Sequence, residues 1–215
     1  MQNILLTGFD PFDEEDINPT GEIIRNLSEE IKNYKVNTVE VPTERYKSVS
    51  IIEQKIDELN PEIIISLGQA GGRTAISVER IAINIDDYRI EDNNGNQPID
   101  EKINLDGPAA YFSTLPVKAI VKELHNNGVP AEISNTAGTF VCNHVMYGVL
   151  DYIKRKGLNI NSGFIHVPYL PVQVINKAGK ASMSIETMRK AIKISIESAI
   201  EYKNEDINYM AGKTH

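Results

Sequence analysis

Residues 131–153 read AEISNTAGTFVCNHVMYGVLDYI, and this stretch decides the fold. A strand-like run at residues 131–135 passes through a turn that contains Gly138 and enters a helix-like run at residues 145–153. Strands that alternate with helices of this length build α/β domains around a mostly parallel sheet, with helices on both faces. The stretch therefore predicts one strand–turn–helix unit of a three-layer α/β/α sandwich.

The turn of this unit carries Cys142, the only cysteine in the chain. At the first turn of a helix, the helix dipole and the unpaired backbone N–H groups both favour a thiolate. The same N–H groups could bind an oxyanion beside the attacking sulfur. Gly138 and Thr139 supply a tight turn and a candidate N-cap. Because a free cysteine is more often a small buried apolar side chain, catalysis also requires a base nearby.

Two histidines are close enough in sequence to be considered as that base. His144 lies two residues from Cys142, and side chains two apart on a helix point to different faces. His166 ends the apolar run at residues 163–167 and precedes Pro168. Active groups of α/β proteins collect at the carboxyl ends of strands. We therefore predict that His166 is the base, with a core histidine bonded to a backbone carbonyl as the alternative.

The alternation of strands and helices extends along the chain. Short apolar runs that end at glycine or proline predict strands, and apolar stripes at helical spacing predict helices. The predicted strands span residues 3–8, 34–41, 62–68, 76–86, 131–135 and 163–167. The predicted helices span residues 18–33, 45–59, 108–127, 143–156 and 184–203, with Gly157 ending the fourth and Ser184 capping the fifth.

Two segments interrupt this alternation. Residues 87–107 are polar and turn-rich, which predicts a hairpin or a surface excursion, and residues 169–183 are loop-like. The 215 residues suffice for one well-buried core, so a single domain over residues 1–215 is expected.

Other chemically useful side chains lie at or near predicted strand ends. Gln69 directly follows the 62–68 strand, and Glu79 lies on an apolar face of the 76–86 strand. A buried carboxylate must find a partner or lose its charge, so Glu79 either pairs with an arginine such as Arg73 or orients a histidine. Gln69, Glu79, Cys142 and His166 converge on one edge of the sheet, as a catalytic site requires.

An aromatic loop follows the first strand. Phe9 and Phe12 flank Asp10 and Pro11, which break regular structure. The two rings either close the end of the sheet or form the wall of a pocket.

Composition excludes several classes of partner. A net charge of −8 argues against nucleic acid and anionic membranes, which both require a basic face. No signal-peptide pattern or membrane-length apolar run is visible. The glycines at residues 71–72 lack a nucleotide fingerprint. A single cysteine cannot form an internal disulfide, which fits a reducing compartment, and we expect a cytoplasmic protein.

Four blocks of the sequence together resemble the pyroglutamyl-peptidase I family of cysteine peptidases, also called pyrrolidone-carboxylate peptidases. The blocks are TGFDPF at residues 7–12, GGR at 71–73 leading into ISVERIAIN at 76–84, GTFVCNH at 138–144, and GFIHVP at 163–168. They occur in the family's order and extend over most of the chain. The resemblance implies that an amino-terminal pyroglutamyl residue is removed from peptides through a thioester. Cys142 would be the nucleophile, His166 its base and then acid, and Glu79 the group that orients His166.

The resemblance also implies a set of substrate-binding residues. The ring pocket would comprise Phe9, Phe12, Thr43, Ile90, Phe140 and Val141, with Asn18 and Gln69 near its polar edge and Arg89 near the oxyanion. The family is intracellular, needs no metal or cofactor, is commonly a homotetramer, and has an α/β/α sandwich fold similar to that of nucleoside phosphorylases. One departure is visible: residues 13–16 are all acidic where the family often has glycines, which adds charge beside the expected pocket mouth.

The chemistry of the residues agrees with such a substrate. A pyroglutamyl ring is a neutral lactam without an ammonium, so aromatic rings and a side-chain amide can bind it without a carboxylate. Phosphorolysis of nucleosides is a second possibility on the same fold, but it requires a basic phosphate cradle that the sequence lacks; phosphate-dependent turnover would reveal it. A peptide-binding domain with a buried thiol is a third, and rapid alkylation of Cys142 would count against it.

Overall fold

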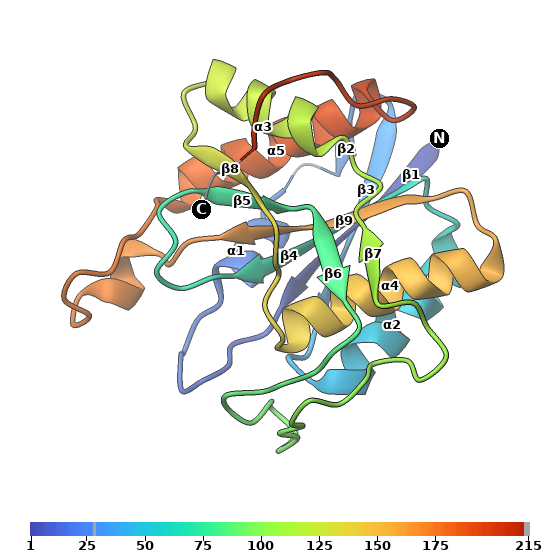
Figure 1. Cartoon of the computed structure of the whole chain (residues 1–215). Coiled ribbons are helices and arrows are strands. Elements are labelled where there is room, and N and C mark those ends of the chain that lie inside the picture. The colour runs from blue at the N-terminus through green and yellow to red at the C-terminus, as the bar shows by residue number, and fades with distance from the viewer. Residues whose placement is uncertain (28, 213–215) are drawn as a thin grey trace.

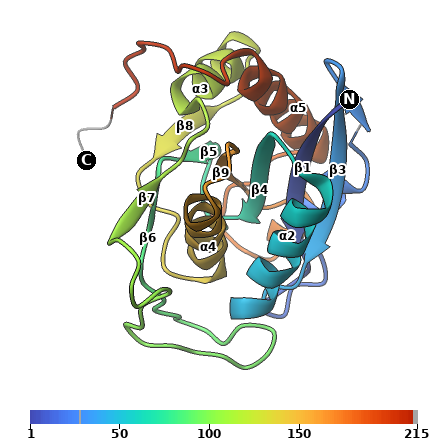
Figure 2. The ribbon, with the colours of Figure 1, turned by 90° about the vertical axis from the view of Figure 1, so that its right-hand side faces the viewer.

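The computed structural model describes residues 1–27 and 29–212 and is built around a seven-stranded sheet. The strand order is β2-β3-β1-β4-β9-β5-β8. Helices cover both faces of this sheet, α1, α3 and α5 on one and α2 and α4 on the other (Figures 1 and 2). The α/β class and the three-layer arrangement predicted from the sequence are confirmed.

The elements have the following bounds. The strands are β1 (Gln2–Phe9), β2 (Glu30–Ile31), β3 (Tyr34–Val41), β4 (Ile63–Gln69), β5 (Ile76–Glu79), β6 (Ile81–Ile83), β7 (Ala110–Phe112), β8 (Ala131–Ser134) and β9 (Asn161–Val167). The helices are α1 (Pro19–Ile24), α2 (Arg45–Leu59), α3 (Val117–Asn126), α4 (Val141–Lys156), the short 3₁₀ helix η1 (Pro171–Val174) and α5 (Ile185–Glu201).

The central strands are apolar on both faces because both faces are covered. Ile4 and Leu6 of β1 pack into the layer of α1, α3 and α5, whereas Leu5 packs into the layer of α2 and α4. Every residue of β4 is buried. Continuous apolar runs are typical of such strands.

The sheet is mostly parallel, as predicted. Strand β1 pairs in parallel with β3 and β4, β4 pairs in parallel with β9, and β5 with β8. Strand β5 is antiparallel to β9, and in this register Ser77 lies opposite His166. The carboxyl ends of β4 and β9 meet at one edge, whereas β5 and β8 begin near that edge and run in the opposite direction.

The predicted helix over residues 18–33 is wrong beyond its first part. Helix α1 ends at Ile24, and β2 then forms a hairpin with β3. Lys32 and Asn33 have φ angles of 46° and 66°, which is the left-handed pair that a two-residue hairpin turn requires. Ile31 is buried in either arrangement, so apolar spacing did not separate helix from strand.

Two other predicted elements are divided in the structure. The 76–86 strand breaks at Arg80, whose N–H bonds to Ser134 next to the main sheet and whose carbonyl accepts from Ser113. The chain then continues as β6, which pairs with β7 in a separate two-stranded sheet. The predicted helix over residues 108–127 begins only at Val117, because Pro116 disfavours a helical backbone in the residue before it.

Several helix ends match the sequence. Ser184 caps α5 by accepting from the N–H of Thr187, and Gly157 ends α4 with a φ of 64°. Residues 87–107 run over the surface between β6 and β7, as expected (Figure 1). Within the part of the chain that the structure describes, no helix has the length and apolarity to cross a membrane.

Candidate active site

Cys142 lies in the first turn of α4, at the end of the turn that follows β8. The helix begins at Val141, two residues before the predicted start, with Phe140 at the N-cap position and no side chain capping the helix. The predicted cap at Thr139 is wrong, since its hydroxyl donates to the carbonyl of Asp87 at 2.7 Å. Gly138 provides the turn with a φ of 79°. The backbone N–H groups of this first turn are therefore free of a side-chain acceptor.

The thiol of Cys142 lies against a glycine in the central sheet. A Cβ atom on Gly68 would approach Sγ to 2.9 Å and the Phe164 ring to 2.7 Å, so only glycine fits here without displacing one of them. Gly68 of β4 is the register partner of His166 on β9. The absence of a side chain at this point of β4 lets the sulfur approach the strand pair that carries the histidine.

The protonation state of Cys142 differs from the expectation. The thiol is partly exposed, but burial by the surrounding protein raises its pKa to about 12, the charge of Glu79 acts in the same direction, and Arg73 opposes it weakly. Burial therefore favours the neutral thiol over the thiolate that the helix start alone would favour. A neutral thiol requires a base that removes its proton as the sulfur attacks.

That base is available in His166. Its side chain is nearly buried, and its Nδ1 lies 2.7 Å from Oε1 of Glu79. An ionised carboxylate can only accept, so Nδ1 carries the proton and Nε2 is left with its lone pair. Cys142 and His166 line the same cavity, and across residues 1–27 and 29–212 no hydrogen bond joins them directly. The alternative of a histidine bonded to a backbone carbonyl does not apply.

Glu79 makes both of the contacts that the sequence offered as alternatives, one with a histidine and one with Arg73. Its Oε1 accepts from His166 and also from Nη1 of Arg73 at 2.6 Å. Burial alone would raise the pKa of the Glu79 carboxyl, but the hydrogen bond and charge of His166 and the charge of Arg73 outweigh it and lower that pKa. Glu79 is therefore a carboxylate, fully buried and held between two donors.

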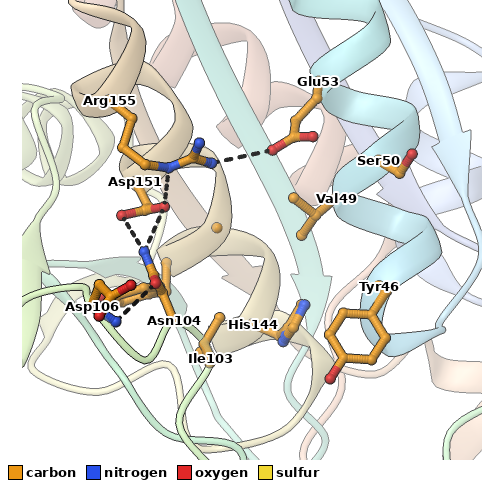
Figure 3. Close-up of a pocket in the computed structure, with 12 residues that line it drawn as sticks. Tyr46, Val49, Ser50, Glu53, Ile103, Asn104, Asp106, His144, Asp151 and Arg155 are labelled. Atoms are coloured by element: carbon orange, nitrogen blue, oxygen red, sulfur yellow. Dashed lines mark hydrogen bonds and ion pairs between the residues drawn. The ribbon is translucent and has the colours of Figure 1, made fainter.

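His144 lies elsewhere, as helix geometry predicted. Its Nδ1 is 2.8 Å from Oδ2 of Asp86, which also accepts from Nε of Arg45 at 2.7 Å. Figure 3 shows His144 facing Tyr46 in a cavity of about 450 Å³ between α2 and α4. Cys142 does not line this second cavity. His144 belongs to a buried polar network that supports the start of α4.

The cavity beside Cys142 has a volume of about 380 Å³. Its apolar wall contains Phe12 and Phe140, whose ring centroids are 5.9 Å apart, and Tyr88 supports Phe140 from behind at 4.7 Å. Five of the predicted substrate-binding residues line it, namely Phe12, Gln69, Arg89, Ile90 and Phe140.

Four other predicted substrate-binding residues are buried outside the cavity lining. Phe9 packs on Phe164, with ring centroids 6.4 Å apart, and Val141 is fully buried in the core. Asn18 caps α1 through Thr20 and donates to the carbonyl of Asp10. Thr43 donates its N–H to the Asp10 carboxylate at 2.7 Å. Asn18 and Thr43 therefore hold the loop at residues 10–18, which carries Phe12 of the aromatic wall.

Some cavity residues had only weak signals in the sequence. Tyr169 covers Gly71 so closely that a Cβ there would lie 2.1 Å from the ring, which explains one of the paired glycines. Asp13 and Glu15 line the mouth, consistent with the acidic run at residues 13–16. Among the residues described, His, Cys, Asp and Glu side chains form no group of three or more suited to hold a metal ion.

Comparisons with known proteins extend over nearly the whole chain. A family model described as pyroglutamyl peptidase matches residues 2–202. The pyrrolidone-carboxylate peptidases of Clostridium perfringens and Fusobacterium nucleatum are 55% and 56% identical, and the alignments cover 97% and 99% of this chain and 98% and 99% of those proteins. The crystal structure of Bacillus amyloliquefaciens pyroglutamyl peptidase I matches with a TM-score of 0.92 at 45% identity, over 96% of this chain and 100% of that one. The pyrrolidone carboxyl peptidase of Thermococcus litoralis gives 0.94 at 43% identity, over 97% and 99%.

Proposed function

This chain belongs to the pyroglutamyl peptidase family of cysteine peptidases, and from that premise we propose that Cys142, His166 and Glu79 perform its reaction. The enzyme removes an amino-terminal pyroglutamyl residue from peptides. One observation carries the assignment of residues: a histidine whose Nδ1 is bonded to a buried carboxylate shares a cavity with a thiol at a helix start. This is the nucleophile, base and orienting group of covalent acyl transfer.

The first half of the reaction forms a thioester. As Sγ of Cys142 attacks the carbonyl carbon that follows the ring, Nε2 of His166 takes the thiol proton, which the raised pKa of the thiol makes necessary. Glu79 stabilises the resulting imidazolium. The oxyanion is bound by the backbone N–H of Cys142, together with Arg89 at the cavity wall. His166 then returns the proton to the departing amine as the C–N bond breaks.

The second half consumes water. His166 removes a proton from a water molecule that attacks the thioester, the C–S bond breaks, and the thiolate recovers a proton from the imidazolium. Free pyroglutamate leaves, and the thiol and neutral histidine are restored. No metal or cofactor enters this sequence of steps.

Recognition of the ring rests on the rest of the cavity. Phe12 and Phe140 hold the flat lactam by dispersion, and Ile90 extends this apolar wall. Gln69 adds a polar side chain to the cavity lining. Glu15 at the mouth is already paired with Lys177, so it does not serve as a partner for an ammonium. Asn18 and Thr43 support the ring site through the loop that carries Phe12, whereas Phe9 and Val141 belong to the core.

We also propose the wider setting of the enzyme. Residues 1–215 form a single peptidase domain that works in the cytoplasm as a homotetramer, with peptides as substrates and neither nucleic acid nor membrane as a partner. The lone cysteine and the charge of −8 support the compartment and the absence of anionic partners. The family supports the tetramer, which light scattering after size-exclusion chromatography would test.

The direct test is hydrolysis of a chromogenic pyroglutamyl amide with and without prior treatment by iodoacetamide. We expect turnover that alkylation abolishes and that does not depend on phosphate. Turnover that survives complete alkylation of Cys142 would remove the thiol from the mechanism. Turnover only in the presence of phosphate would instead support phosphorolysis.

A further inference from the structure

Gln173 is a buried amide outside the cavity that touches a residue lining it. It lies in η1, within the segment between β9 and α5 that the sequence presents as a loop. Only 8% of its surface is exposed, as is also true of Gln69 at the end of β4. Nε2 of Gln173 donates to Oε1 of Gln69 at 2.9 Å, so two amides that are 104 residues apart in sequence are joined.

Main-chain groups fix the orientation of the Gln173 amide. The N–H of Leu170 donates to its Oε1 at 2.9 Å, and its Nε2 donates to the carbonyl of Ile17 at 3.1 Å. A backbone N–H can only donate and a backbone carbonyl can only accept. Rotating this amide by 180° would place its NH₂ group against the N–H of Leu170 and its oxygen against the carbonyl of Ile17. The end of Gln173 that faces Gln69 is therefore the NH₂ group.

This orientation determines that of Gln69. Since Gln173 presents a donor, Gln69 must meet it with its oxygen, and its own NH₂ group is directed away from Gln173. Gln69 lines the cavity together with Cys142 and His166. Within residues 1–27 and 29–212, the Nε2 atom of Gln69 has no hydrogen-bond partner. A residue that lines the cavity thus carries a donor with no acceptor among the described residues.

We propose that Gln173 is a positioning residue that keeps the NH₂ group of Gln69 directed at the lactam carbonyl of the pyroglutamyl ring. This inference rests on the proposed function and deepens it. The lactam oxygen is a hydrogen-bond acceptor, and a binding site that offers it a pre-oriented donor loses no free energy in turning the amide. A freely rotating Gln69 would present its oxygen to the lactam oxygen part of the time.

The Gln173 amide also contacts the acidic run at residues 13–16. Nε2 of Gln173 is also 3.3 Å from Oε2 of Glu15, whose other oxygen pairs with Lys177. Glu15 therefore helps to hold the donor end of Gln173, while the carbonyl of Ile17 fixes it from the same loop. Lys177 contacts Glu15 but not Gln69, which makes it a matched control.

The test uses two substitutions at residue 173 in the full-length enzyme. In its ionised form, Gln173→Glu can still accept from Leu170 but offers Gln69 only acceptors, so the Gln69 amide then turns its oxygen toward the substrate; the assays are therefore run at a pH at which this carboxyl is ionised. Gln173→Met removes the donor without forcing the turn. With a pyroglutamyl amide, we expect KM to rise about tenfold for Gln173→Glu and less for Gln173→Met, with kcat within about twofold of wild type. Lys177→Met should leave KM unchanged.

A second background separates positioning from a structural role. In Gln69→Leu, which has no side-chain donor to orient, both substitutions at residue 173 should change KM by less than about twofold. Equal increases in KM with and without Gln69, or an unchanged KM in Gln173→Glu, would overturn the inference while wild-type turnover leaves the proposed function intact. Absence of pyroglutamyl cleavage by the wild-type protein would overturn both.

Discussion

Replacing Glu79 by glutamine isolates the effect of one charge on the reaction. Oε1 of Glu79 accepts from Nδ1 of His166 and from Nη1 of Arg73. An amide oxygen can accept both bonds, so Glu79→Gln should keep the shape of the site and leave the proton on Nδ1. Arg73 is 27% exposed and keeps its bond to the carbonyl of Thr136, so its charge remains solvated. What the substitution removes is the stabilisation of the imidazolium.

The expected loss follows from the geometry. Two unit charges about 4 Å apart interact by about 4 kcal/mol at an effective dielectric constant of about 20. If about half of the proton has moved to His166 in the transition state, about 2 kcal/mol is lost. Since 1.36 kcal/mol corresponds to a factor of ten, kcat should fall about 30-fold, and at least about tenfold. Glu79 does not line the cavity, so KM should change little.

The assay is steady-state hydrolysis of a pyroglutamyl amide, with thermal unfolding followed by circular dichroism on the same samples. Arg73→Gln is the control, because it removes the second donor but leaves the carboxylate on His166; its loss in kcat should be smaller than that of Glu79→Gln. An unchanged kcat in Glu79→Gln together with a large fall in Tm would refute the reasoning. Glu79 would then be a structural residue.

Four further outcomes are expected. Cys142→Ala should abolish hydrolysis with nearly unchanged Tm, and Cys142→Ser should be almost inactive because the site is built for a thiol, as assays of both would show. His166→Ala should eliminate the chemical step in single-turnover assays, whereas His144→Ala should mainly lower Tm by removing a donor to Asp86. Because the fold lowers the pKa of Glu79 from 4.5, the ionised carboxylate stabilises the folded protein above pH 4.5. Denaturant titrations should show that this stabilisation is lost as the pH falls through the lowered pKa, and Glu79→Gln should lack this pH-dependent part of the stability. For substrates with the same leaving group, kcat/KM for the pyroglutamyl substrate should exceed that for the glutaminyl, glutamyl and prolyl substrates by at least about tenfold. The reason is that an ammonium is costly to desolvate and that proline lacks the lactam carbonyl. Equal values for the pyroglutamyl and glutaminyl substrates would contradict this.

The sequence predicted that the candidate catalytic residues meet because the carboxyl ends of parallel strands share an edge; this holds for β4 and β9, but β5 and β8 run antiparallel to β9 and end at the opposite edge. Cys142 follows one predicted strand, His166 ends another, and Glu79 lies on an apolar face of a third. Cys142 and His166 nevertheless line one cavity, and Glu79 bonds to His166, because the chain continues from β8 through residues 135–140 before α4 begins. The reversed direction of β5 and β8 was not predictable, since apolar spacing carries no information about strand direction.

The predictions that were wrong concern segments whose sequence pattern is compatible with two structures. Ile31 continues the apolar stripe of the first helix, yet it lies in β2 because Lys32 and Asn33 form a tight hairpin turn. A two-residue loop between apolar positions was the available signal. Arg80 offered none, because the break there depends on contacts with Ser113 and Ser134 from distant segments.

The chemistry of the thiol also required the fold. The helix start at Cys142 is a local feature, and local features favour a thiolate. Burial of the sulfur against β4 and β9 is a tertiary feature, and it raises the pKa instead. The contact between Gln173 and Gln69 could not be predicted from the sequence for the same reason. Gln173 belongs to no periodic pattern, and the two residues are 104 positions apart.

The central claim is that Cys142 carries the pyroglutamyl group during turnover. Rapid acid quenching of the enzyme with a pyroglutamyl ester, followed by mass spectrometry of its proteolytic fragments, measures this directly. The account predicts a pyroglutamyl thioester on the fragment that contains Cys142, formed by the wild type and absent from Cys142→Ser. Full turnover without an adduct on this fragment, retained in Cys142→Ser, would contradict it.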